Sequence, residues 1–191
     1  MKKIFKGDFK VTQGYSATHG GIDIVGSEDI EVISPVDGVV KSSTIITDKG
    51  NLTWEWGNYI RVDDEKGNRY YFCHLKSRSV KVGDKIKTGD VLGVMGNTGK
   101  SFGAHCHFET RTKGNYRTNP CDFLELPNEE RTYLLKNNWI KLKRWRYFDE
   151  NRNPVTGFKK INNKLYFFAK EDFDGIKKYE LITTDKEGEI I

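Results

Sequence analysis

The sequence predicts a mainly β protein: a compact antiparallel β-sheet or sandwich followed by a small β-hairpin repeat module. Three observations support this prediction. Apolar and polar residues alternate over short runs, Gly-Asp and Asp-Gly pairs separate these runs, and residues 1 to about 124 show no helical periodicity. The 191 residues, of which 36% are hydrophobic and 31% charged, are enough for one good core and a smaller appendage.

The predicted strands follow one another closely in the first part of the chain. Residues 32–46 are apolar or alternating around Pro35 and an Asp-Gly pair, and residues 58–75 are typical of a hairpin whose turn is formed by residues 64–68. Residues 80–94 predict three short strands separated by two Gly-Asp turns. Short strands joined by such tight turns indicate a compact antiparallel sheet or sandwich.

The sheet pattern ends close to Pro127, which divides the chain into three predicted parts. Residues 1–126 form the first domain. Residues 127–136 form a linker or short helix, for which Asn128 is the predicted N-cap. Residues 137–191 form the second domain.

A weak internal repeat defines this second domain. Residues 139–148 align with residues 158–167, and a degraded third copy follows at residues 176–182. Each copy predicts one aromatic-rich hairpin, which cannot bury its own face and must stack on its neighbour.

Composition excludes several classes of protein. No run of eighteen or more apolar residues is present, so no membrane span is predicted. The start, MKKIFKGDFKVTQGY, lacks the apolar region of a secretory signal, and we expect a chain made in the cytoplasm without a signal peptide. The three cysteines, an odd number, predict free buried thiols: Cys73, Cys106 and Cys121.

The net charge of +5 and the pI near 8.9 favour an anionic partner, which includes nucleic acid, a membrane surface and an anionic cell wall. Only the charge and the aromatic repeat favour nucleic acid, and no nucleic-acid partner is predicted.

The four histidines carry the chemistry that the sequence predicts. On a strand, His105 and His107 point to the same face because side chains alternate with period two. A catalytic zinc site takes three protein ligands and leaves one position for water. His19 and Asp23, separated by a Gly-Gly turn, are two candidate ligands and His107 is a third, while His74 and His105 remain to handle protons. The alternative for each is a structural histidine with satisfied hydrogen bonds.

Four segments resemble the lysostaphin-type (LytM-like) peptidoglycan metalloendopeptidases: HGGID at 19–23, YFCHL at 71–75, VKVGDKIKTGDVLG at 80–93 and GNTGKSFGAHCHFE at 96–109. The resemblance covers residues 11 to about 124. It implies a small β-rich, Zn2+-dependent domain that cuts peptide cross-links of bacterial cell walls. Carried over by position, it makes His19, Asp23 and His107 the zinc ligands. It also implies that His74 and His105 activate water or stabilise the transition state.

One departure from this family lies before the first ligand. The family often has a longer loop with an arginine there, whereas here Gln13-Gly14-Tyr15 leads almost directly to His19. Tyr15 is therefore a candidate for an oxyanion hydrogen bond, with a packed turn aromatic as the alternative. Glu109 shares the strand face of His105 and His107, and is either a partner that orients a ligand or an exposed strand carboxylate.

The C-terminal repeat resembles choline-binding-type cell-wall repeats, in which aromatic side chains cage a quaternary ammonium group. The candidate aromatics are Trp139, Trp145, Tyr147, Phe158 and Tyr166. The resemblance implies binding of choline or teichoic acid. Two alternatives are a wall-anchoring module without choline specificity and a small aromatic core without a ligand.

Together these patterns predict a zinc-dependent endopeptidase acting on peptidoglycan in the cell wall, as a phage endolysin or a virion-associated lysin. One alternative is a non-catalytic cell-wall-binding or regulatory module with the same fold. Another is a lipoyl- or biotinyl-type carrier domain, suggested by residues 80–94. Such carriers need an acceptor lysine at a hairpin tip, where this chain has Met95-Gly96-Asn97.

Overall fold

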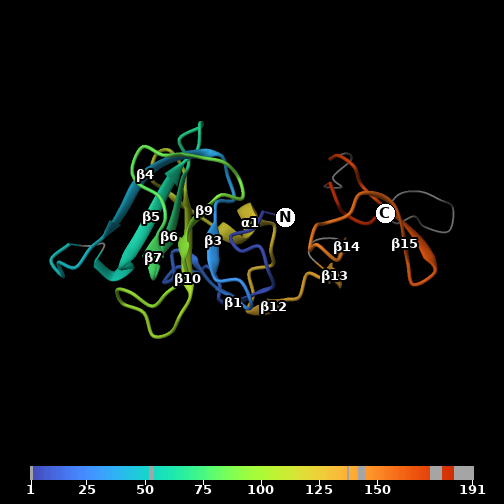
Figure 1. Cartoon of the computed structure of the whole chain (residues 1–191), viewed down its shortest axis with the longest axis horizontal. Helices are drawn as coiled ribbons and strands as arrows, with labels where there is room; N and C mark the ends of the chain where they lie inside the picture. The colour runs from blue at the N-terminus through green and yellow to red at the C-terminus, as the bar shows by residue number, and fades with distance from the viewer. Residues whose placement is uncertain (1, 52–53, 137, 142–144, 173–177, 183–191) are drawn as a thin grey trace. The chain divides into compact units, whose positions relative to one another are not determined.

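The computed structural model describes residues 2–51, 54–136, 138–141, 145–172 and 178–182 (Figure 1). The chain divides into two compact units, Met1–Thr132 and Tyr133–Ile191. Nearly all regular structure is antiparallel β-sheet, which confirms the predicted mainly β class. Within the described ranges, no helix is long and apolar enough to cross a membrane.

The first unit is built around a nine-stranded sheet with the order β12-β1-β2-β10-β6-β5-β4-β8, to which β11 is added beside β10. Its strands are β1 (Phe9–Gln13), β2 (Ile22–Gly26), β4 (Gly38–Ile45), β5 (Asn58–Asp63), β6 (Arg69–Cys73), β8 (Lys85–Ile86), β10 (Cys106–Arg111), β11 (Arg117–Thr118) and β12 (Arg131–Tyr133). A three-stranded sheet of order β3-β9-β7 completes the unit: β3 (Glu31–Ile33), β7 (Ser77–Arg78) and β9 (Val91–Val94). The 3-10 turn η1 (Trp54–Trp56) precedes β5.

Alternation along the central strands separates the core from the functional face. In β2, Ile22 and Ile24 are at most 1% exposed, whereas Asp23 between them is partly exposed. In β10, Cys106 and Phe108 are fully buried while His107 points to the opposite face. The central strands therefore carry an apolar side and a side that bears polar groups.

The hairpin predicted for residues 58–75 is confirmed, with β5 and β6 as its strands. Its turn is held by Asp64, whose carboxylate accepts hydrogen bonds from the backbone N–H of Asn68 and from the hydroxyl of Tyr70. Gly67 supplies the left-handed φ of +81° that this turn requires.

Residues 80–94 contain two strands rather than the predicted three. Both Gly-Asp turns form, and Asp84 and Asp90 accept backbone N–H groups within them. However, β8 pairs with β4, and β9 pairs with β3 and β7, so these short strands extend two different sheets instead of pairing with each other. Turn signals are local, whereas the choice of a pairing partner depends on distant strands.

The short helix predicted within residues 127–136 is wrong: this segment contains β12, at the edge of the large sheet. The helix of this region lies earlier, as α1 (Pro120–Leu124). Asn119 caps it by accepting the N–H of Cys121, and Pro120 stands at its first position. The three thiols are free and buried, as predicted.

The second unit contains the two predicted hairpins, β13 (Asn138–Lys141) with β14 (Trp145–Phe148), and β15 (Gly157–Ile161) with β16 (Lys164–Phe168). Residues 178–182 join them, because Leu181 N–H donates to Trp145 O and Ile182 N–H donates to Phe167 O. The start of the predicted third copy, residues 176–177, lies outside the described residues. The described part of this third copy, residues 178–182, is the segment that connects the two hairpins.

Candidate metal centre

The strand register places Asp23 and His107 directly opposite each other on β2 and β10. Opposite residues of an antiparallel pair have Cβ atoms only about 4.5–5.5 Å apart, so their side chains meet on one face. His19 lies in the turn that leads into β2, where its N–H donates to Ser16 Oγ and the backbones of the two residues exchange hydrogen bonds.

Gly21 permits the close approach between this turn and β10. A Cβ atom at this position would lie 2.6 Å from Phe108 O and 2.7 Å from His107 Nε2. Any larger residue would therefore displace the ring of His107.

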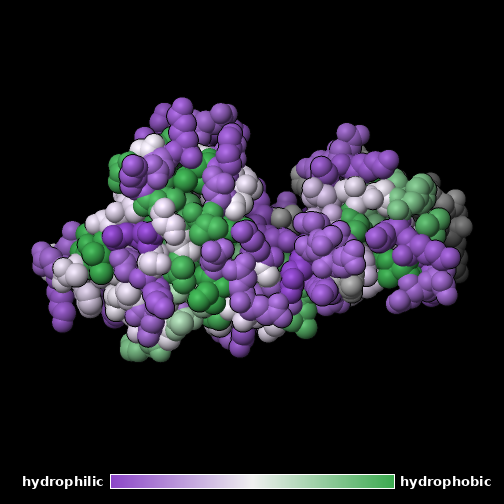
Figure 2. All heavy atoms as spheres, viewed as in Figure 1, coloured by the Kyte–Doolittle hydropathy of each residue, from purple (hydrophilic) through white to green (hydrophobic). Residues whose placement is uncertain are grey.

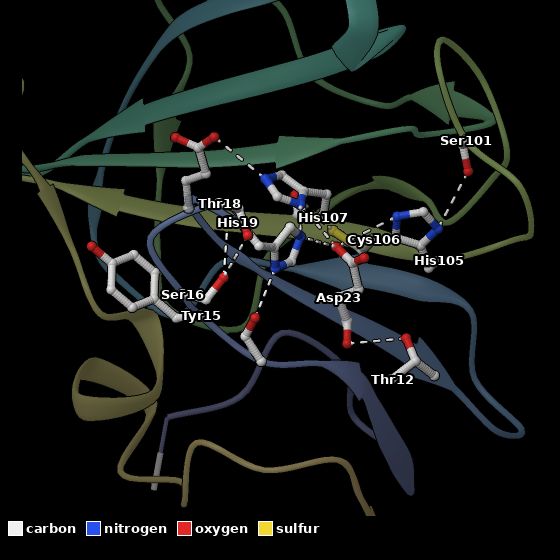
Figure 3. Close-up of polar contacts among 12 residues, drawn as sticks. Thr12, Tyr15, Ser16, Thr18, His19, Asp23, Ser101, His105, Cys106 and His107 are labelled. Carbon is white, nitrogen blue, oxygen red and sulfur yellow. Dashed lines mark hydrogen bonds and ion pairs between the residues drawn. The ribbon is translucent and has the colours of Figure 1, made fainter.

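Three ligand atoms converge in this way, and Figure 3 shows the side chains of His19, Asp23 and His107 pointing toward one another. Asp23 Oδ1 lies 2.8 Å from His107 Nδ1 and 3.2 Å from His19 Nε2, and the two nitrogens are 3.1 Å apart. In a tetrahedral zinc site with bonds of about 2.0–2.2 Å, neighbouring ligand atoms are about 3.3–3.6 Å apart. The observed triangle is tighter than that, by about 0.5 Å at its shortest side, so the side chains need only move slightly apart to hold the ion.

The outer nitrogens of both imidazoles are already hydrogen-bonded. His19 Nδ1 lies 2.8 Å from Gly14 O, and His107 Nε2 lies 3.3 Å from Glu109 Oε1. These partners fix the N–H on the outer nitrogen of each ring, so that the lone pair of the inner nitrogen faces the triangle. Two lone pairs and a carboxylate around one point suit a divalent cation, and zinc takes this combination of ligands. The residues present therefore fit a zinc ion.

The other two histidines lie beside the triangle. His74 follows β6, and its ring centroid lies 4.8 Å from that of His105 and 5.9 Å from that of His107. His74 Nδ1 is 2.8 Å from Thr98 O, and His105 Nδ1 is 2.8 Å from Gly103 O. In both rings Nδ1 is therefore bound to a backbone carbonyl and Nε2 is left for the chemistry, and His105 Nε2 is 3.5 Å from Asp23 Oδ1.

The backbone of His74 has a φ of +63°, which is unusual for a residue with a side chain. Such a conformation costs about 1–3 kcal/mol and is concentrated at functional sites. It is held by the hydrogen bond from His74 N–H to Trp56 O at 2.8 Å.

Burial and hydrogen bonding set the protonation of this cluster. Burial lowers the pKa of His74 to about 4, so its imidazole is neutral at neutral pH. Burial acts in the same direction on His107, but in the metal-free cluster the hydrogen bonds to Asp23 and Glu109 outweigh it and raise the pKa of His107 to about 9. A bound cation must therefore displace the proton from Nδ1 of His107 before that nitrogen can act as a ligand. For Asp23, burial raises the pKa, and the hydrogen bonds from His107 and His19 outweigh it and hold the pKa well below its usual range.

Glu109 is 2% exposed, and it is a buried partner of His107 rather than an exposed carboxylate. Its other oxygen, Oε2, accepts a hydrogen bond of 2.8 Å from Arg111 Nε and a second one from Arg111 Nη2. The Arg111 guanidinium in turn lies 4.7 Å from the ring centroid of Tyr71 and 5.5 Å from that of Trp56. Sequence reasoning missed Arg111, although it continues the alternation of His105, His107 and Glu109 along β10.

A groove of about 590 Å³ opens over these side chains. It contains all five residues of the cluster, and its walls come from the turn before β2, from η1 and from the loop before β10. Phe102 in this loop is 99% exposed. Other residues that line the groove include Thr18, Gly20, Glu55, Trp56, Lys100, Ser101, Glu109 and Arg117.

Residues 17–120, more than half of the chain, match Peptidase family M23. The chain belongs to peptidase family M23. This confirms the resemblance to lysostaphin-type metalloendopeptidases for the first unit.

Several known proteins are similar to this M23 domain. The glycyl-glycine endopeptidase ALE-1 of Staphylococcus capitis is 32% identical over 111 residues, which are 56% of this chain and 29% of the relative. The peptidoglycan DD-endopeptidase ShyC of Vibrio cholerae is 32% identical over 117 residues, 61% of this chain and 25% of the relative. The crystal structure of a putative M23 peptidase from Pseudomonas aeruginosa superposes with a TM-score of 0.54 at 26% identity, over 65% of this chain and 50% of that chain. The chain spans about a quarter of the length of the curated relatives it matches.

Tyr15 does not join the M23 cluster. Its ring points away from His19 and His107 (Figure 3), and the side chain is not part of the groove lining. Asn128 holds its backbone instead, through hydrogen bonds to Tyr15 N–H at 2.8 Å and to Tyr15 O at 2.9 Å. This placement favours the packed-turn interpretation over the oxyanion role.

In the second unit, four of the five predicted aromatics come together around Trp139. Its ring centroid lies 6.4 Å from that of Trp145, 5.4 Å from that of Tyr147 and 4.9 Å from that of Tyr166. Phe168, which sequence reasoning did not select, joins them at 5.6 Å.

Phe158 does not join this group. It pairs across its hairpin with Phe167, at 4.7 Å between centroids. Because side chains alternate along a strand, this pair lies on the opposite face from Tyr166.

Proposed function

We propose that this protein is a zinc-dependent endopeptidase that hydrolyses peptide cross-links of bacterial peptidoglycan. The observation that carries the proposal is the triangle of His19 Nε2, Asp23 Oδ1 and His107 Nδ1, with two further imidazoles beside it in one groove. The relatives ALE-1 and ShyC, described as a glycyl-glycine endopeptidase and a peptidoglycan DD-endopeptidase, support the substrate class.

His19, Asp23 and His107 would hold the zinc ion. When bound, zinc supplies a Lewis acid that lowers the pKa of water and polarises the scissile carbonyl. His74, neutral at neutral pH, takes the proton from the attacking water at Nε2. The water oxygen bonds to the carbonyl carbon, the C–N bond breaks, and the proton passes to the leaving amine. His105 is held at Nδ1 by Gly103 O, and with a proton on Nε2 it donates a hydrogen bond to the carbonyl oxygen and stabilises the charge that develops there.

The test is the release of new amino groups from purified bacterial cell walls. We expect release by the zinc-loaded protein, loss of release after treatment with a chelator, and recovery when zinc is added back. A protein with one zinc bound per chain that releases no amino groups from walls of several cross-link types would contradict the proposal.

Two substitutions separate a hydrolase from a non-catalytic wall binder with the same fold. His74→Ala should abolish amino-group release while zinc binding is retained, because His74 is not one of the three ligands. Asp23→Ala should abolish both amino-group release and zinc binding, because Asp23 is one of the three ligands. A protein that only binds walls should sediment with them equally well in all three forms.

For the second unit we propose a wall-binding role. Its support is the apolar surface of this unit: Trp145, Phe158 and Leu165 are 42%, 73% and 67% exposed, and Figure 2 shows hydrophobic atoms there (green, right). Sedimentation of the full chain with purified walls tests it. Trp145→Ala should reduce the bound fraction and Lys164→Gln should not. Loss of wall binding in the presence of free choline would identify choline as the ligand. Loss of wall binding in the presence of teichoic acid would identify teichoic acid instead.

The domain limits 1–126, 127–136 and 137–191 and the origin as a phage endolysin or virion-associated lysin stay predictions. Limited proteolysis tests the limits. Lysis of living cells by protein added from outside, compared with lysis after expression inside the cell, tests how the enzyme reaches the wall.

A further inference from the structure

Arg117 places a guanidinium beside the metal centre, and no residue in the described part of the chain accepts a hydrogen bond from its side chain. It lies on β11, directly opposite Arg111 on β10, and it lines the groove. Its side chain is 54% exposed, and among the described residues its ion pair is the one of 3.7 Å between Nε and Glu109 Oε2. It also covers Gly20, where an added Cβ would lie 2.5 Å from Arg117 Nε. Arg117 is therefore next to the turn that carries His19.

The surrounding charges leave N–H donors of the Arg117 guanidinium available to a ligand. Glu109 is one carboxylate facing two guanidiniums, and its Oε2 already accepts two hydrogen bonds from Arg111. Lys100, the other cation that lines the groove, is paired with Glu55 at 2.8 Å. A guanidinium has five N–H donors in a planar fork that matches a carboxylate. Positive charge thus exceeds negative charge at this end of the groove, and the excess is located on an exposed group.

We propose that Arg117 is a specificity-determining residue that binds a carboxylate of the substrate peptide beside the scissile bond. This inference rests on the proposed peptidase function and names one chemical feature of the substrate. A cell-wall peptide with a free carboxylate at this point gains a charge-assisted pair, whereas the same peptide with a carboxamide does not.

The experiment compares two substrates and four forms of the full-length zinc-loaded protein. The substrates are soluble cross-linked peptidoglycan fragments, prepared with a muramidase, either untreated or with their carboxylates converted to amides by carbodiimide and ammonia. The proteins are the wild type, Arg117→Gln, Arg117→Lys and the control Lys113→Gln, which removes a cation from an exposed turn away from the groove. The rate of amino-group release is measured against fragment concentration, and zinc affinity is measured by chelator competition.

On untreated fragments, Arg117→Gln should raise KM by about five- to tenfold with kcat changed by less than about twofold, as expected for loss of one partly exposed charged hydrogen-bonding group. Arg117→Lys should recover part of this loss because it keeps the charge without the fork. On amidated fragments the wild type and Arg117→Gln should have the same KM. Lys113→Gln should match the wild type on both substrates, and zinc affinity should be equal in all four proteins.

An unchanged KM of Arg117→Gln on untreated fragments would overturn the inference and leave the peptidase function intact. An equal rise in the KM of Arg117→Gln on both substrates would also overturn the inference, and so would a weakened zinc affinity of this variant. Either result would show that Arg117 acts through Glu109 and not on the substrate carboxylate. If the wild type cleaves neither substrate, the peptidase function itself fails and the inference fails with it.

Discussion

Glu109 Oε1 lies 3.3 Å from His107 Nε2, so a buried carboxylate holds the outer nitrogen of a candidate metal ligand. The same carboxylate is bound on its other side by Arg111, which is stacked against Tyr71 and Trp56. The chain of contacts runs from the aromatic rings through Arg111 and Glu109 to the metal centre. It fixes both the tautomer and the orientation of His107.

The first prediction concerns this hydrogen bond. Glu109→Gln removes the negative charge that orients His107 and makes its inner nitrogen more basic. Zinc affinity should fall about 10- to 100-fold, as is typical for loss of such a partner. Chelator competition on the purified protein measures it. Glu65→Gln, an exposed carboxylate in the β5–β6 turn, is the control and should bind zinc as the wild type does. Equal affinities in all three proteins would contradict the role of Glu109.

The second prediction concerns stability. Arg111→Met leaves the buried Glu109 without the fork that binds its Oε2. Breaking one side of a buried pair costs about 3–5 kcal/mol, and we expect about 2–4 kcal/mol here because His107 and Arg117 still face the carboxylate. Urea unfolding of the zinc-free protein measures the loss. Arg111→Lys should lie in between, and a double variant Arg111→Met, Glu109→Gln should be more stable than Arg111→Met alone. A double variant less stable than the single one would show that the arginine acts through other contacts.

The third prediction concerns Gly21. A Cβ at this position meets Phe108 O at 2.6 Å and His107 Nε2 at 2.7 Å. Gly21→Ala should therefore weaken zinc binding and lower the free energy of unfolding by about 1–3 kcal/mol, the usual cost of overpacking. Calorimetry with and without zinc measures both effects. Gly7→Ala, where the added Cβ meets Asp29 Cβ at 3.4 Å, is the control and should change neither. Full zinc affinity in Gly21→Ala would show that the turn and β10 can move apart.

The fourth prediction concerns pH and the thiols. Burial raises the pKa of Cys121 to about 11, and it also raises the pKa values of Cys73 and Cys106. At pH 8 the native protein should react with no thiol reagent on the time scale of minutes, and all three cysteines should react once it is unfolded in guanidinium.

The sign of the linked stability change follows from the same shifts. Above the unfolded-state thiol pKa of about 8.5, the folded state holds more protons than the unfolded state, so stability should fall as pH rises from about 9 to 11. Titration of unfolding free energy against pH measures it, with Cys121→Ala flattening part of the slope. Rapid labelling of a native thiol at pH 8 would contradict both statements.

Much of the site follows from local sequence. Alternation along residues 105–109 puts two histidines and Glu109 on one face, and the Gly-Gly turn brings His19 back toward Asp23. The structure unites His19, Asp23 and His107, with His74 and His105 next to them. Arg111 was missed because an arginine at a strand end is normally solvated, and Arg117 because its strand has only two residues. Phe158 was misplaced because aligned repeats do not reveal which face of a hairpin a residue occupies.

By itself, the sequence determined the β class, the turns at Asp64–Asn68 and at the two Gly-Asp pairs, the buried thiols and the types of side chain at the metal centre. These properties depend on alternation, on left-handed glycine conformations and on side-chain chemistry, which act over a few residues. Tertiary structure alone decided that β10 lies between β2 and β6, that residues 131–133 form an edge strand, and that Arg111 and Arg117 share Glu109. Strand order and shared ion pairs join residues far apart in the chain, and no local pattern encodes which distant strands come together.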